Sequence, residues 1–310
     1  MFKKQVKKTV ESTRVVIVGA GNVGATSAFA IMIQGIASEI VLIDRSKKKS
    51  EGEIMDLEQG VSFAPHARLW AGDYQDCKDA DVIIITAGAK QQPGQTRLEL
   101  VDTNTKIITD IIKNIKKYTK TAVILMVTNP LDITTYVATK TAGFSYGQVF
   151  GTGTTLDSSR FRYLIAKKLQ IDPESVGAYL LGEHGDSSVP VYSRANVMGE
   201  PVNLSRQDLQ ACYEDAKKAA YEVIDRKGAT YYAIALAVAR ITRAILFDEN
   251  HVFAASVLLR GEQGIKDMCL SVPVVVGRTG VKKIIEIKLS AEEKKLLQKS
   301  AEVMKKTMEK

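Results

Sequence analysis

The 310-residue sequence contains few cysteines and no long apolar run. Its three cysteines, Cys77, Cys212 and Cys269, are far apart and form no Cys-x-x-Cys pair, so we expect neither disulfides nor a zinc site. Reduced thiols fit a cytoplasmic location. No apolar stretch approaches the ~20 residues that span a bilayer. The segment Met1–Ser12 is polar and lacks the apolar core of a secretory signal, so we expect a solvated arm and no membrane partner.

Basic residues outnumber acidic ones by 43 to 35, which gives a net charge of +8. Such an excess is found in proteins that bind nucleic acids or anionic membranes. Here the basic residues lie mainly near the chain ends and on helix faces, and they form no stripe interleaved with aromatic residues. We therefore interpret the charge as solvated surface and expect no nucleic-acid partner. A positive field also favours the approach of small anionic substrates.

The first half of the chain alternates short apolar runs with helix-like stretches. The longest helix is expected over 98–118, where apolar residues recur at spacings of three and four. The expected strands are 15–18, 40–43, 68–71, 82–86 and 122–128. This alternation predicts an α/β fold, with a Rossmann-type doubly wound parallel sheet in a dinucleotide-binding domain of residues 1–149.

The pattern changes after about residue 150. Helices are expected at 156–169, 207–227 and 230–246, and strands at 252–259, 267–276 and 282–287. The last helix opens with a capping box, in which Ser290 is followed three residues later by Glu293. The pattern predicts a C-terminal α+β substrate domain of residues 150–310.

A glycine-rich turn follows the first expected strand. Gly19 permits a tight turn, Gly21 lets the backbone approach a pyrophosphate, and Gly24 lets helix and strand pack closely. Twenty residues after Gly24, at the end of the second strand, Asp44 can accept hydrogen bonds from a ribose diol. This order of elements predicts a dinucleotide-binding unit, with a purely structural glycine turn as the alternative.

Three further segments carry charged residues in unusual settings. The loop 86–97 has glycines near both ends, as a closing lid has, although a plain polar loop is the alternative. Asp157 and Arg160 share a helix face, where a surface ion pair is the alternative. His184 lies among glycines and acidic residues after an apolar strand and is a candidate general base. The other two histidines lack such a setting.

Five motifs together resemble the lactate/malate dehydrogenase family over nearly the whole chain from Arg14. They are Gly-Ala-Gly-Asn-Val-Gly from Gly19, Gln-Gln-Pro-Gly-Gln-Thr-Arg ending at Arg97, Val-Thr-Asn-Pro-Leu-Asp ending at Asp132, Leu-Asp-Ser-Ser-Arg ending at Arg160, and Gly-Glu-His-Gly-Asp ending at Asp186. The resemblance implies an NAD-dependent oxidoreductase. The implied reaction is reversible hydride transfer between L-lactate and NAD+, which gives pyruvate and NADH.

The resemblance also implies roles for individual residues. His184 would carry the proton, with Asp157 as its buried partner. Arg160 would grip the substrate carboxylate, and Arg97 would polarise the reacting carbonyl when the loop closes. The remaining substrate contacts implied are Gln91, Asn129 and Thr230. The implied cofactor contacts are Gly19, Gly21, Val23, Gly24, Asp44, Lys49, Tyr74, Gly88, Ala89, Val127, Asn129 and Thr152, and no metal is expected.

Substrate choice is expected to depend on Gln91. Malate enzymes of this family carry arginine at that place, which pairs with the second carboxylate of the substrate. A neutral glutamine would leave that charge unpaired in a closed pocket, at a high energetic cost. Lactate and pyruvate are therefore favoured, with malate or another L-2-hydroxy acid of small side chain as the alternative.

Regulation and assembly are implied only by the resemblance. Many bacterial relatives are activated by fructose 1,6-bisphosphate through an arginine, matched by Arg162, and a histidine, whose place is taken by Gly177. We therefore expect weak activation or none. The family also implies a homo-oligomer, by analogy a homotetramer, that acts in glycolysis and pyruvate fermentation.

Overall fold

The computed structural model describes residues 12–89 and 97–308, and for Arg97 and Leu98 it describes the backbone alone. The expected N-terminal arm up to residue 11 and the substrate-selecting Gln91 lie outside the described residues. Within the described part of the chain, no helix is both long and apolar enough to cross a membrane.

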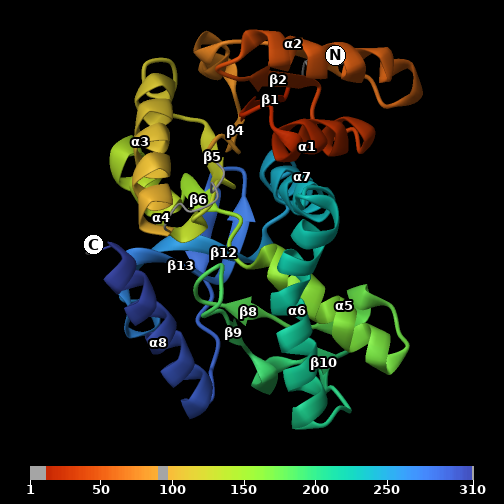
Figure 1. Ribbon diagram of the computed structural model, residues 1–310, viewed down its shortest axis with the longest axis vertical. Coiled ribbons are helices and arrows are strands. Elements are labelled where there is room, and N and C mark those ends of the chain that lie inside the picture. The colour runs from red at the N-terminus through yellow and green to blue at the C-terminus, as the bar shows by residue number, and fades with distance from the viewer. Residues whose placement is uncertain (1–11, 90–96, 309–310) are drawn as a thin grey trace, which may run out of the picture.

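The central feature is a nine-stranded sheet whose first six strands are parallel (Figure 1). These strands lie in the order β3-β2-β1-β4-β5-β6, which is the doubly wound order of a dinucleotide-binding sheet. Their bounds are β1 Arg14–Val18, β2 Glu39–Ile43, β3 Arg68–Ala71, β4 Val82–Ile85, β5 Val123–Met126 and β6 Val149–Gly151. The predicted Rossmann-type sheet is confirmed.

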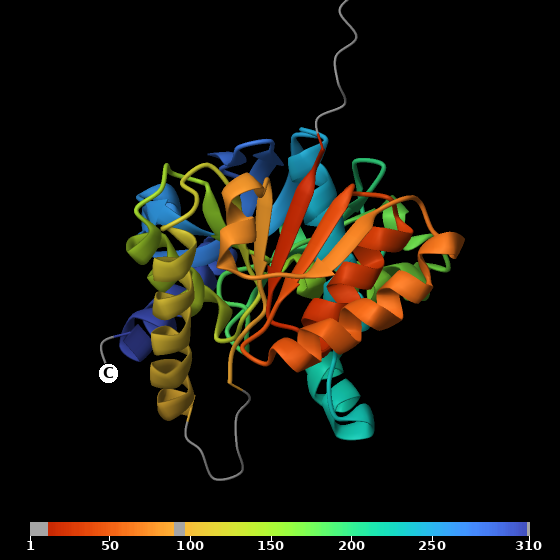
Figure 2. The same cartoon turned by 90° about the horizontal axis from the view of Figure 1, so that it is seen from above.

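Both faces of this sheet are buried, which explains why its strands are continuous apolar runs. In β1, Val15 and Ile17 face one hydrophobic core, whereas Val16 and Val18 face the other. Helices α1 (Asn22–Ile33) and α2 (Lys47–Gln59) pack on the first face. Helices α3 (Arg97–Ile115) and α4 (Leu131–Ala142) pack on the second, so that helices cover the sheet on both sides (Figure 2).

Three antiparallel strands extend the same sheet beyond β6. They are β12 (His251–Arg260), β13 (Lys266–Gly277) and β14 (Gly280–Ile284), and β12 meets β6 where Ser256 lies opposite Gly151. The last strand was predicted at 282–287, but it begins at Gly280 and ends at Ile284. It begins two residues early because Gly280, at φ +90°, makes the tight turn that starts its pairing with β13.

The second half adds helices and short strands around this extension. Helices α5 and α6 pack against each other around a small hydrophobic core that includes Phe161, Ile165 and Leu209. Helix α8 packs against β13. The helices are α5 Thr155–Leu169, α6 Arg206–Lys227, α7 Tyr232–Leu246 and α8 Ala291–Met308. The short strands are β7 Val176–Gly177, β8 Leu180–Leu181, β9 Val189–Pro190, β10 Asn196–Val197 and β11 Glu200–Pro201. The predicted mixed C-terminal region is confirmed.

Candidate active site

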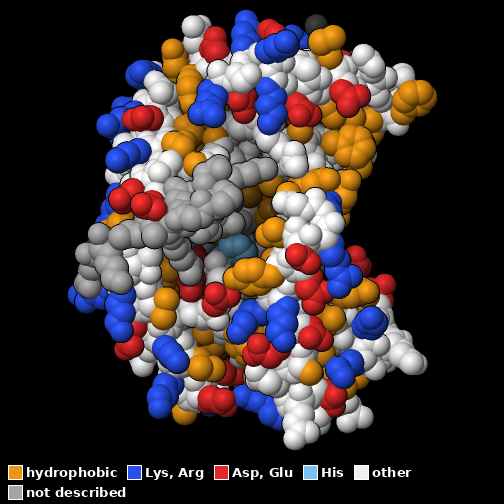
Figure 3. Space-filling model, viewed as in Figure 1, with side chains coloured by type: hydrophobic (Ala, Val, Ile, Leu, Met, Phe, Trp, Pro, Cys, Tyr) orange, Lys and Arg blue, Asp and Glu red, His pale blue; other side chains and the backbone are white. Residues whose placement is uncertain are grey.

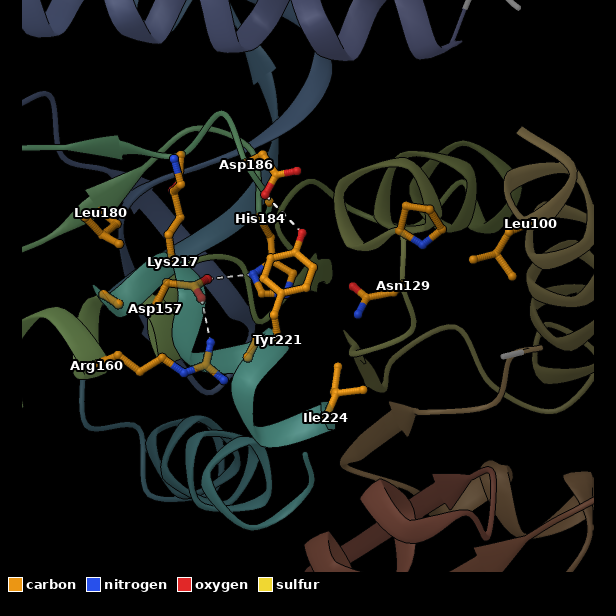
Figure 4. Close-up of a pocket in the computed structure, with 15 residues that line it drawn as sticks. Leu100, Asn129, Asp157, Arg160, Leu180, His184, Asp186, Lys217, Tyr221 and Ile224 are labelled. Carbon is orange, nitrogen blue, oxygen red and sulfur yellow. Dashed lines mark hydrogen bonds and ion pairs between the residues drawn. The ribbon is translucent and has the colours of Figure 1, made fainter. Parts of the chain in front are cut away.

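A cavity of about 360 Å³ lies where the carboxyl end of the parallel sheet meets the second half of the chain. Its lining comes from α3, from the segment after β5, from α5, from the loop after β8 and from α6. The hollow is visible in the middle of the face drawn in Figure 3, with a histidine side chain inside it. Figure 4 shows Asp157, Arg160 and His184 on one side of the cavity and Asn129 on the other. Four of the predicted site residues therefore share one cavity.

His184 and Asp157 form a hydrogen-bonded pair. The Nδ1 atom of His184 lies 2.6 Å from Oδ2 of Asp157. The histidine side chain is 26% exposed and the carboxylate 15% exposed. Because Nδ1 is held by the carboxylate, Nε2 is the ring nitrogen available to a substrate. The geometry is that of an acid–base histidine oriented by a partner carboxylate.

Electrostatics in this pair favour the charged forms of both groups. Burial on its own would lower the pKa of His184, but the charge and hydrogen bond of Asp157, with a further contribution from Asp132, raise that pKa to about 9. Burial would raise the pKa of Asp157, but His184 and Arg160 outweigh it, so that this pKa is lowered. His184 is therefore protonated at neutral pH and ready to donate a proton.

Arg160 lies one helical turn after Asp157 on α5, and one of its terminal nitrogens is 2.9 Å from Oδ1 of that carboxylate. The two residues share a helix face, as their spacing predicted. Asp157 thus accepts from Arg160 on one oxygen and faces His184 on the other. The guanidinium has five N–H donors, so this contact leaves donors for a second carboxylate in the cavity.

A buried asparagine holds the opposite wall of the cavity. The Oδ1 atom of Asn104 in α3 accepts the backbone N–H of Ala89 at 2.7 Å, and its Nδ2 donates to the carbonyl of Asn129 at 2.7 Å. Asn104 is 1% exposed. It ties the segment after β4 to the segment after β5, which fixes the place of Asn129. Sequence reasoning did not single out Asn104, because an asparagine within an amphipathic helix carries no distinctive pattern.

Two carboxylates of the region also escaped sequence reasoning. Asp132, in the first turn of α4, accepts the backbone N–H of His184 at 2.7 Å. Glu183, beside the histidine, is 4% exposed and accepts from the Ser187 hydroxyl. Asp132 ends one of the five motifs, and Glu183 lies within another. The spacing of these motifs in the sequence, however, does not predict that Asp132 lies next to His184.

The glycine turn after β1 fits a dinucleotide. A Cβ atom at Gly24 would lie 1.8 Å from the carbonyl oxygen of Gly19, and Gly19 has a φ of +117°. At Gly21, which precedes α1, an added Cβ would meet nothing within 4 Å, so this backbone faces open space. Among the described residues no side chain caps α1, so a phosphate can approach its first N–H groups. The residues present therefore fit the pyrophosphate of a dinucleotide.

Asp44 lies beside this turn at the end of β2. Its Oδ2 accepts the N–H of Ala20 at 2.8 Å, and its Oδ1 accepts the N–H of Ser46 at 2.9 Å. Each carboxylate oxygen can accept a second hydrogen bond, so Asp44 is both anchored and able to bind a ribose diol. Lys49 lies exposed in α2 and Tyr74 is partly buried in a 3-10 helix.

The remaining predicted residues are distributed around the cavity and the dinucleotide-binding turn. Gly88 and Ala89 follow β4, Val127 follows β5, and Thr152 is buried after β6. Val23 lies in the first turn of α1. Thr230 lies between α6 and α7, and it is not among the described residues that line the 360 Å³ cavity. Arg97 begins α3.

By the resemblance, an activator site would need Arg162 together with a histidine at position 177, where this chain has glycine. Gly177 is in β7, and a Cβ added there would lie 2.6 Å from Nδ2 of Asn196. Arg162 is partly buried on α5, and burial lowers its pKa. Asn196 thus fills the space into which a longer side chain at position 177 would extend.

Comparisons with known proteins agree with this geometry. Residues 13–151 match the family model of the lactate/malate dehydrogenase NAD binding domain, and residues 154–310 match that of the lactate/malate dehydrogenase alpha/beta C-terminal domain. NAD is therefore the cofactor, as predicted.

Individual relatives match over almost their whole length. An L-lactate dehydrogenase of Acetivibrio thermocellus is 46% identical over 301 residues, covering 94% of this chain and 95% of the relative. One of Thermoanaerobacter pseudethanolicus is 48% identical, covering 94% and 97%. The crystal structure of a minor L-lactate dehydrogenase from Enterococcus mundtii, in its ligands-bound form, superposes with a TM-score of 0.94 at 42% identity, covering 96% and 98%. The resemblance seen in the motifs is confirmed, and the chain belongs to the lactate/malate dehydrogenase family.

Proposed function

We propose that this chain is an NAD-dependent L-lactate dehydrogenase that interconverts L-lactate and pyruvate. The observation that carries the proposal is the linked set of His184, Asp157 and Arg160 on one wall of a cavity that faces Asn129. This set can move a proton and bind a carboxylate within one small space. When bound, NAD supplies the hydride donor or acceptor.

His184 is the proton carrier of the proposed reaction. In pyruvate reduction its charged ring donates a proton from Nε2 to the ketone oxygen, and in lactate oxidation the neutral ring accepts the alcohol proton. Asp157 stabilises the charged ring and fixes the tautomer of the neutral one. A well-placed general acid or base contributes about 10²–10⁴-fold to the rate.

Arg160 binds the substrate carboxylate in this proposal. Arginine suits the role because its planar donors can make two parallel hydrogen bonds to one carboxylate. Its existing contact with Asp157 holds the guanidinium against the cavity wall. Asn129, held by Asn104, donates a hydrogen bond to the reacting oxygen.

The loop 86–97 acts as the lid in this proposal. By resemblance, Arg97 polarises the substrate carbonyl when the lid closes and excludes water. By the same resemblance, Gln91 would disfavour a second carboxylate on the substrate. By the same resemblance, Thr230 would contact the substrate from the segment between α6 and α7.

The cofactor residues divide by the part of the dinucleotide that they contact. Gly19 makes the tight turn and Gly24 lets helix and strand pack closely, so that the backbone at Gly21 and Val23 can approach the pyrophosphate at the start of α1. Asp44 binds the adenosine ribose and disfavours NADP, while Lys49 and Tyr74 flank the adenosine. The nicotinamide side is lined by Gly88, Ala89, Val127, Asn129 and Thr152.

We also propose that the chain divides into a dinucleotide-binding domain of residues 1–149 and a substrate domain of residues 150–310. We further propose that it assembles as a homotetramer. Four large apolar side chains are exposed on α1 and α7, which pack against each other: Phe29, Ile33, Tyr232 and Leu236. An exposed apolar surface of this kind is typical of an interface between subunits. The three cysteines are all unpaired and buried, which supports a reducing, cytoplasmic setting. The proposed interconversion of lactate and pyruvate corresponds to a role in glycolysis and pyruvate fermentation.

The test is direct. The protein is mixed with NADH and pyruvate, the loss of NADH absorbance is followed, and the lactate enantiomer is identified by chiral chromatography. We expect one L-lactate for each NADH consumed. His184→Ala should reduce kcat by about 10²–10⁴-fold while NADH still binds. D-lactate as the product, or near-normal turnover by the variant, would contradict the proposal.

A further inference from the structure

Asp132 is a buried carboxylate to which the reaction described above gives no role. It is the second residue of α4 and is 2% exposed. Its position in the first helical turn favours a negative charge, because the helix dipole is positive there. Burial raises the pKa of Asp132 to about 6, although its hydrogen bonds act in the opposite direction. The group is therefore ionised at neutral pH and above.

The two oxygens of Asp132 connect two other elements to α4. Oδ2 accepts the backbone N–H of His184 at 2.7 Å, and Oδ1 accepts the hydroxyl of Ser256 at 2.6 Å. Ser256 is fully buried in β12, opposite Gly151. The carboxylate thus holds the main chain of the catalytic loop at the residue that carries the imidazole.

The same short segment also carries Asn129. Asn129 lies in the segment after β5, and Asp132 lies three residues later in the first turn of α4. Asn129 and His184 face the cavity from opposite sides (Figure 4). Asp132 holds the main chain of His184 through the hydrogen bond that it accepts from the backbone N–H. In the proposed reaction the side chains of Asn129 and His184 address the same substrate oxygen. The four-residue segment from Asn129 to Asp132 therefore sets the distance between these two side chains.

Several charged groups surround His184. Asp157 from α5 faces the ring, Asp132 from α4 faces the main chain, and Glu183 and Asp186 flank it in its own loop. Arg160 from α5 is the nearby cation that opposes the charge of His184, and Lys217 from α6 lines the same cavity. Asp132 is thus a second buried carboxylate that favours the imidazolium.

We propose that Asp132 is a positioning residue, which fixes the His184 main chain against Asn129 and supplies a second negative charge that stabilises the protonated ring. The proposal rests on the assigned acid–base role of His184. It adds that the short segment between β5 and α4 sets both the place and the proton affinity of the histidine.

Two substitutions separate these two effects. Asp132→Asn keeps the shape: its amide oxygen can accept the N–H of His184, and its NH2 group can donate to Ser256, whose hydroxyl also accepts. This variant removes only the charge. Asp132→Ala removes both hydrogen bonds. Glu293→Gln is the matched control, because Glu293 is a buried carboxylate of α8 that binds Ser193 and Ser290 and, among the described residues, makes no hydrogen bond or ion pair with His184.

The primary readout is the titration of His184 by NMR in the full-length protein with labelled histidine. The chain has only three histidines, so the His184 signal is identified by its loss in His184→Gln. We expect Asp132→Asn to lower the His184 pKa by at least about 0.5 pH units, and the same fall in the pH profile of kcat/KM for pyruvate. Glu293→Gln should leave the His184 pKa unchanged.

The second readout is the separation of kcat from KM. Asp132→Ala should lower kcat for pyruvate by about tenfold or more, because a misplaced proton donor is costly. The KM for pyruvate and the binding of NADH should stay within about threefold. An unchanged His184 pKa in Asp132→Asn would overturn the charge role, and an unchanged kcat in Asp132→Ala would overturn the positioning role. If the parent protein does not reduce pyruvate at all, the proposed function fails, while the titration still decides the electrostatic effect of Asp132.

Discussion

Replacing Asp157 by asparagine should change the pH at which the protein can reduce pyruvate. The parent His184 has a pKa of about 9, whereas burial without its carboxylate partner would place it below the ordinary value of 6.5. A fall of at least about 2.5 pH units corresponds to ~3.4 kcal/mol lost from the charged form. Arg160 would lose a partner as well, and its charge would lower the pKa of His184 further.

The sign and size of the effect follow from the protonated fraction. Pyruvate reduction needs the charged ring, which is present below the pKa. At pH 8 about nine-tenths of the parent histidine is charged, but only about 3% would be charged at a pKa of 6.5. At pH 6 both proteins are mostly charged. The variant should therefore lose ~25-fold in kcat/KM between pH 6 and pH 8, while the parent changes little.

The assay is the initial rate of NADH loss with pyruvate across this pH range, since kcat/KM reports the free enzyme–NADH complex. Any loss already present at pH 6 measures the orienting role of Asp157 separately from its charge. Asp157→Glu, which keeps a carboxylate, should restore part of the parent profile. A variant whose kcat/KM is as flat as that of the parent from pH 6 to pH 8 would refute the reasoning.

Three further predictions concern the cofactor, the substrate and regulation. Asp44→Ala should narrow the preference for NADH over NADPH by about tenfold or more in kcat/KM, because the carboxylate binds the ribose diol and repels a 2′-phosphate; an unchanged ratio would exclude this role. Gln91→Arg should shift the oxaloacetate-to-pyruvate ratio of kcat/KM by roughly a few hundredfold, since arginine pairs a second carboxylate and is left unpaired by pyruvate; a shift within about threefold would remove Gln91 as the selector. Fructose 1,6-bisphosphate should change the KM for pyruvate by less than about twofold, because Gly177 supplies no cation; a tenfold fall would show that another basic residue binds it.

Much of the fold could be predicted because its strands are buried on both faces. Val15–Val18 and Val82–Ile85 are continuous β-branched runs, and such runs stand out in a sequence. The three-residue β6 was not predicted, since so short a segment has no readable period. Helix α4 was not specified either. Its sequence is rich in threonine, which has low helix propensity, and packing against the sheet and β12 stabilises it instead.

The site was predictable where its residues lie close together in the chain. Asp157 and Arg160 are three apart on one helix, so their shared face followed from helical geometry. The pairing of Asp157 with His184 spans 27 residues and came from the family resemblance. Asp132 and His184 are 52 residues apart, and no local rule connects a helix N-terminus to a distant loop. Asn104 was missed because an asparagine within an amphipathic helix carries no distinctive pattern, and its partners Ala89 and Asn129 lie 15 and 25 residues away.

The measurement that tests the central claim most directly is kcat/KM for pyruvate and for oxaloacetate, measured with NADH on the parent protein and on His184→Ala. The account predicts that the parent prefers pyruvate by about tenfold or more, a difference of at least ~1.4 kcal/mol in transition-state binding. It also predicts that His184→Ala loses activity with both substrates. Equal or greater activity with oxaloacetate, or a variant that still reduces pyruvate at near the parent rate, would contradict it.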